Sequence, residues 1–107
     1  MEQFAVADLD LAVSFYRAVD DPSARAVLDF LIDHPDERFD GAAIADTLGL
    51  PQHRDVARAT FAYGEAARDM GRARPWQEAQ LGYLMPAEQA SLLRQARDRV
   101  TAVRRSA

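Results

Sequence analysis

Proline and glycine residues divide this chain into short segments, and they constrain its fold more than any other feature. The breaks fall at Asp20-Asp21-Pro22, His34-Pro35, Gly49-Leu50-Pro51, Gly71 and Pro86. The residue before a proline disfavours helical geometry, and glycine tolerates the left-handed conformation that follows many helix ends. These positions are therefore typical helix boundaries, and we expect a set of short helices rather than one long helix.

Between these breaks, apolar residues recur at spacings of three and four, which is typical of helices with one buried face. The predicted helices cover residues 8–19, 22–33, 41–48, 53–70 and 87–104. Asp21 and Asp40 are expected to cap the second and third helices, and Gly49 to end the third.

The inner face of the fourth helix is predicted to hold Val56, Ala57, Thr60, Phe61, Gly64, Ala67 and Met70. Glycine inside a helix costs about 1 kcal/mol relative to alanine. Gly64 therefore indicates close packing against another helix, with a kink as the alternative.

Two short segments outside the helices are typical of strands. Residues 37–39 predict a strand of a single bridge, and Trp76 with Tyr83-Leu84-Met85 predicts a small hairpin across a polar stretch. Trp76, Tyr83 and Met85 are expected to cover the core, because large side chains dominate burial in small domains, with a binding surface as the alternative for the two aromatic residues. The predicted fold class is therefore mainly α with a small β-hairpin.

The composition excludes several classes of function. A chain of 107 residues forms one domain, and the absence of Cys excludes disulfides, thiolate zinc sites and cysteine catalysis. The two His residues are far apart, and no phosphate-binding glycine motif occurs. We expect no enzyme, no cofactor and no metal site. Neither a membrane span nor a signal peptide is recognisable, so the expected location is the cytoplasm.

The net charge of −4 conceals two halves of opposite sign. Residues 1–50 carry three Arg against eleven acidic residues, a net charge of −8, whereas residues 51–107 carry ten Arg against six acidic residues, a net charge of +4. The overall acidity therefore does not exclude a nucleic-acid partner for the second half.

From Ser23 onward, the order of elements resembles a winged helix-turn-helix domain. The resemblance rests on residues 26–31, on Arg38-Phe39, and on the run Ile44-Ala45-Asp46-Thr47-Leu48-Gly49-Leu50, which resembles the helix and turn before a recognition helix. The resemblance implies a single domain, 1–107, with an N-terminal helical extension (1–20), a winged helix-turn-helix core (21–86) and a C-terminal helix (87–107).

A closer resemblance covers most of the chain, from Phe15 to Arg97. The stretches LIDHPDERFDGAAIADTLGL, PW at 75–76 and YLMPAEQASLLRQAR are similar to a group of small uncharacterised actinobacterial winged-helix proteins. This similarity implies a fold but no activity, because fold alone does not determine function.

A winged helix-turn-helix domain implies contacts with double-stranded DNA, and we predict a transcriptional regulator. The first turns of the recognition helix meet base edges, and the wing meets phosphates. The residues predicted to bind DNA are Gln52, His53, Arg54, Arg58, Arg68, Arg72 and Arg74. For these side chains a solvated or ion-paired face is the alternative, since Asp55, Glu65 and Asp69 lie among them.

Two further partner predictions follow from the remaining surfaces. The amphipathic terminal helices favour a homodimer, with packing on their own domain as the alternative. The second function is a winged-helix protein-interaction module without DNA binding. Its acidic face, with Asp29, Asp33, Asp36 and Glu37, would bind a basic partner, or its basic half would bind an acidic one. The two functions differ in one observable: a continuous positive face favours DNA, whereas interleaved acids and arginines favour a protein partner.

Overall fold

A computed structural model describes residues 1–80 and 82–106 of the chain. Residue 81, inside the predicted hairpin, and residue 107, at the end of the predicted C-terminal segment, lie outside the described residues. The elements are η1 (Val6–Asp8), α1 (Leu9–Arg17), α2 (Pro22–Asp33), β1 (Arg38–Asp40), α3 (Gly41–Leu48), α4 (Arg54–Asp69), β2 (Gln77–Ala79), β3 (Gly82–Leu84) and α5 (Ala87–Ser106). The described chain is therefore mainly α-helical with a small antiparallel sheet, as predicted.

The predicted boundaries of α2 and α3 are confirmed by hydrogen bonds at the helix ends, whereas α1 ends at Arg17, two residues earlier than predicted, and α5 continues to Ser106. The side chain of Asp21 accepts a hydrogen bond from the backbone N–H of Ser23, and that of Asp40 accepts one from Ala43. Gly49 adopts a left-handed conformation with φ of 67° directly after α3. Capping satisfies backbone groups that have no partner inside the helix, so local sequence is enough to set these ends.

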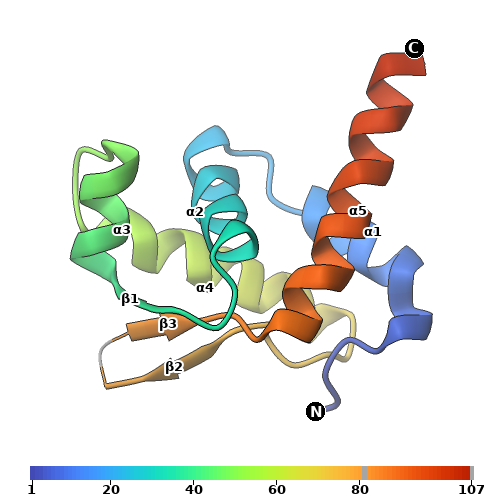
Figure 1. Cartoon of the computed structure of the whole chain (residues 1–107), viewed down its shortest axis with the longest axis horizontal. Helices are drawn as coiled ribbons and strands as arrows, with labels where there is room; N and C mark the ends of the chain where they lie inside the picture. Colours follow the sequence, from blue (N-terminus) through green and yellow to red (C-terminus); the bar gives the residue numbers. More distant parts are fainter. Residues whose placement is uncertain (81, 107) are drawn as a thin grey trace.

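The three strands form one antiparallel sheet in the order β1-β3-β2. Tyr83 at the centre of β3 lies opposite Phe39 on one side and Glu78 on the other. The first strand begins and ends one residue later than predicted, at Arg38 and Asp40. Figure 1 shows the hairpin of β2 and β3 at one edge of the molecule, below α3 and α4.

The core lies where α1, α2, α4 and α5 meet. Phe15 of α1 is fully buried, and its ring lies 5.2 Å from that of Phe4 and 5.4 Å from that of Tyr63, between ring centroids. Trp76 and Met85, at either end of the hairpin, are 4% and 0% exposed. Their predicted burial is confirmed, so the hairpin is anchored to the core at both ends.

The two terminal helices pack against each other within the chain, as Figure 1 also shows. The predicted apolar stripe of α5 is buried from Ala90 to Val100, whereas Val103 is 60% exposed. Arg99 of α5 forms an ion pair with Asp10 of α1 at 2.9 Å. A homodimer through these helices stays a prediction, but most of the apolar surface it would use is already covered within the chain.

Among the residues that the structure describes, no helix has both the length and the hydrophobicity that crossing a membrane requires. The same residues include no group of three or more His, Cys, Asp or Glu side chains arranged to hold a metal ion.

Candidate interaction surface on α4 and the hairpin

The buried face of α4 differs from the predicted one. Val56, Ala59, Thr60, Tyr63 and Ala67 are the buried residues of the helix. Phe61 and Ala57, which were predicted to face inward, are exposed, and 70% of Phe61 is accessible to solvent. The prediction for these two residues is therefore wrong.

The physical reason is that two aromatic residues compete for the core side of α4. Tyr63, rather than Phe61, packs against the ring of Phe15. Phe61 has Ala57 and Gly64 at helical spacings, but charged Arg58 and Glu65 lie at the same spacings. The corresponding neighbours of Tyr63 are all uncharged, so the helical pattern favours Tyr63 as the inner residue. The sequence analysis missed Tyr63, although the uncharged residues around it were a signal that could have found it.

Gly64 does not mark close packing between two helices, contrary to the prediction. A Cβ atom at this position would lie 3.3 Å from Cδ of Arg74, on the segment that leads into the hairpin. The stem of Arg74 therefore crosses α4 at Gly64, and the glycine provides room for an arginine side chain rather than for a helix.

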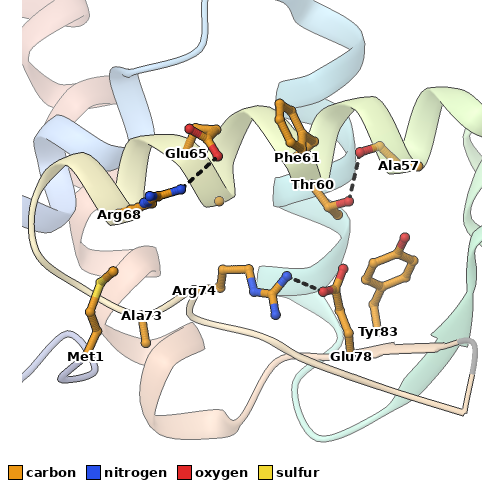
Figure 2. Close-up of a pocket in the computed structure, with 11 residues that line it drawn as sticks. Met1, Ala57, Thr60, Phe61, Glu65, Arg68, Ala73, Arg74, Glu78 and Tyr83 are labelled. Atoms are coloured by element: carbon orange, nitrogen blue, oxygen red, sulfur yellow. Dashed lines mark hydrogen bonds and ion pairs between the residues drawn. The ribbon is translucent and has the colours of Figure 1, made fainter.

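A groove of about 570 Å³ lies between α4 and the hairpin. Ala57, Phe61 and Gly64 contribute from α4, and Arg74, Glu78 and Tyr83 contribute from the hairpin and the segment before it. Figure 2 shows the two sides of this groove, with ion pairs of Arg68 to Glu65 and of Arg74 to Glu78 along it. The groove combines an apolar lining with equal numbers of charged groups of each sign.

The beginning of α4 is open to solvent. Gln52, His53 and Arg54 are exposed and line a second, shallower hollow with Pro51. The ring Nε2 of His53 lies 3.2 Å from a carboxylate oxygen of Asp46. Arg54 forms no ion pair with another described residue, so this side chain is available to a ligand.

The other arginines predicted to bind DNA along α4 and the hairpin have acidic neighbours. Arg58 lies 3.9 Å from Asp55, and Arg68 lies 4.0 Å from Glu65. Arg74 pairs with Glu78, an acidic residue that the sequence analysis did not weigh. Exposed ion pairs of this kind contribute little to stability. The acidic partners nevertheless cancel almost all of the positive charge along α4 and the hairpin.

Arg72 was also predicted to bind DNA, but its side chain forms an ion pair with Asp8 in the N-terminal segment. Its Nε and one terminal nitrogen donate hydrogen bonds of 3.0 and 3.1 Å to the two carboxylate oxygens of Asp8. The backbone N–H of the next residue, Ala73, donates to the carbonyl of Glu2 at 2.8 Å. Arg72 therefore ties the N-terminal segment to the end of α4.

We predict that the contribution of this ion pair to stability disappears in acid. The two hydrogen bonds from Arg72 hold the pKa of Asp8 below its ordinary value of 3.8. Ionised Asp8 therefore favours the folded state above about pH 4, and this contribution falls as the pH drops through the lowered pKa. Thermal unfolding of the wild type and of Asp8→Asn is the measurement. The difference in Tm should be constant above about pH 4 and should shrink below it. A difference that persists unchanged at lower pH contradicts the prediction.

The predicted acidic face is also largely occupied within the chain. Asp29 accepts a hydrogen bond of 2.9 Å from the hydroxyl of Tyr16, and Arg97 bridges Asp29 and Asp33 at 3.3 and 2.8 Å. Asp36 accepts a hydrogen bond from the first backbone N–H of α5. These carboxylates join helices to one another, so they are poor candidates for a docking surface.

Comparison with known proteins gives a family but no activity. A family model matches residues 9–100, and its description is a family of unknown function (DUF6416). No curated protein and no solved structure matches the chain.

Proposed function

Because the chain belongs to the DUF6416 family, whose function is unknown, we propose a function from its geometry: a winged-helix module that docks another protein. The docking surface in this proposal is the exposed face of α4 together with the adjoining groove.

The winged-helix assignment is supported by the order of the elements. A helix, a strand, two helices and a hairpin follow one another from α2 to β3, and the strands pair in the order β1-β3-β2. The connection between α3 and α4 begins at left-handed Gly49, as the turn of a helix-turn-helix motif requires. In this assignment α4 occupies the place of the recognition helix, and β2 with β3 forms the wing.

The observation that carries the docking function is the exposure of Phe61. A phenylalanine that is 70% exposed lies midway along α4, beside a groove with an apolar lining. Aromatic side chains surrounded by polar groups are typical centres of protein interfaces. The acids beside Arg58, Arg68 and Arg74 favour the same function, because they lower the attraction of this face for phosphates.

Binding of duplex DNA remains a second candidate, and the beginning of α4 favours it. Gln52 and Arg54 are exposed there, and Arg54 has no ion-pair partner among the described residues. Glutamine reads adenine and arginine reads guanine in the major groove. DNA binding and protein docking would use overlapping parts of α4, so one experiment with two arms separates them.

In the first arm, the purified chain is tested for retention of random-sequence duplex DNA at low salt. Protein docking predicts no retention. Retention that falls with salt and that Arg54→Ala weakens would establish the second candidate and overturn the first.

In the second arm, the tagged chain is used as bait in its native host, with Phe61→Ala as the matched variant. Docking through α4 predicts a stoichiometric protein partner that the wild type retains and the variant loses. Equal retention by both baits, or no partner at all, contradicts docking through this face.

A further inference from the structure

The charged residues of α4 are arranged antisymmetrically about its midpoint. The helix runs from Arg54 to Asp69, so its centre lies between Phe61 and Ala62. Residues equidistant from this centre carry opposite charges in each of three pairs, namely Arg54 with Asp69, Asp55 with Arg68, and Arg58 with Glu65. No other charged residue occurs in the helix.

Such an arrangement makes the helix complementary to a second, antiparallel copy of itself. A two-fold axis through the centre of α4 would place residues 54, 55 and 58 of one copy opposite residues 69, 68 and 65 of the other. Arg58 would then face Glu65 and Arg54 would face Asp69, whereas like charges would cost several kcal/mol in a buried contact. Interfaces related by a two-fold axis require exactly this self-complementarity.

Four of the six charged residues share the exposed side of the helix with Phe61, whereas the side chain of Asp55 is only 22% exposed and lies off this face. Arg54, Arg58, Glu65 and Arg68 lie seven, three, four and seven residues from Phe61. These are the spacings at which side chains lie on one helical face. Phe61 is the large apolar side chain at the centre of this face, and Ala57 and Ala62 are the small residues beside it.

We propose that the protein partner of α4 is a second copy of this chain, docked antiparallel with Phe61 at the two-fold axis. This inference rests on the proposed docking function and names its partner. Phe61 of each copy packs over Ala62 of the other, and Arg58 of each copy pairs with the other copy's Glu65.

The ion pairs within a single chain do not oppose this arrangement. Arg58 and Asp55 are 3.9 Å apart, Arg68 and Glu65 are 4.0 Å apart, and both arginine side chains are about 70% exposed. Exposed pairs between residues three apart contribute at most a few tenths of a kcal/mol. These side chains can therefore rotate toward a second copy at little cost.

The first test is the mass of the full chain in solution, measured by sedimentation over a concentration series. The wild type is expected to dimerise, and Phe61→Glu to weaken the dimer by about 30-fold or more, because it buries an unpaired carboxylate at the two-fold axis. Val103→Glu is the matched control, since Val103 is also an exposed apolar residue, 60% accessible, but lies near the end of α5. Loss of the dimer in the control and not in Phe61→Glu would overturn the proposal in favour of the terminal helices.

The second test reverses the charges of one predicted pair. Arg58→Glu and Glu65→Arg are each expected to weaken the dimer by about 10-fold, because each creates two like-charged contacts across the axis. The double variant restores opposite charges in both contacts and should recover most of the affinity. A double variant as weak as the single ones overturns the antiparallel pairing, and helical circular dichroism confirms that each variant is folded.

A photo-crosslinking residue at position 61 separates failure of this inference from failure of the proposed function. A product of twice the chain mass supports the second copy as partner. A product of any other mass overturns the second copy while leaving docking through α4 in place. No product in the native host overturns both.

Discussion

Replacing Phe15 with Ala is expected to lower the free energy of unfolding by about 3–5 kcal/mol. Phe15 is fully buried between the rings of Phe4 and Tyr63, so it joins the N-terminal segment, α1 and α4. Removing the ring loses the free energy gained by burying it away from water, and it also leaves a cavity. Both effects destabilise the folded state. Urea unfolding followed by circular dichroism measures the change.

Phe61→Ala is the matched control for this prediction. The same substitution at a residue that is 70% exposed should change the free energy of unfolding by no more than about 0.5 kcal/mol. The comparison is made at a protein concentration where both variants are monomeric. Equal losses for the two variants would contradict the assignment of Tyr63 and Phe15, rather than Phe61, to the core.

The second large effect is expected at Trp76. The chain has a single Trp, which is 4% exposed at the start of the hairpin. Trp76→Ala should cost about 3–5 kcal/mol, because it detaches the hairpin from the core and leaves a large cavity. Thermal unfolding followed by circular dichroism gives the change.

Trp76→Phe is the control, and it should be milder than Trp76→Ala. The ring Nε1 of Trp76 is buried without a hydrogen-bond partner among the described residues, so a phenylalanine loses no hydrogen bond there. A loss as large as that of the alanine variant would contradict this prediction.

The helix boundaries were predictable because they depend on neighbouring residues. Asp21 and Asp40 cap helices that begin one residue later, and Gly49 ends α3. Each of these interactions joins groups only two to four residues apart, so the chain carries their signal locally. The hairpin was predictable for a related reason, because its β-forming residues flank a short polar stretch.

The candidate site was less predictable, because its main features depend on distant contacts. From the sequence, Arg72 was predicted to bind DNA phosphates beside the wing. In the structure it pairs instead with Asp8, which lies 64 residues away in the chain. Arg97 likewise joins α5 to Asp29 and Asp33 of α2. Carboxylates that look like a free acidic face in the sequence are therefore partly used to hold helices together.

The amino-acid sequence by itself determines where α2 and α3 begin and end, and it also carries the antisymmetric charges of α4. Both properties depend on positions within one continuous segment. Only the tertiary structure decides that the ring of Tyr63 packs against Phe15, and which charges remain available on the surface. The physical reason is that these partners lie far apart in the chain and meet only when several helices bury their apolar faces together.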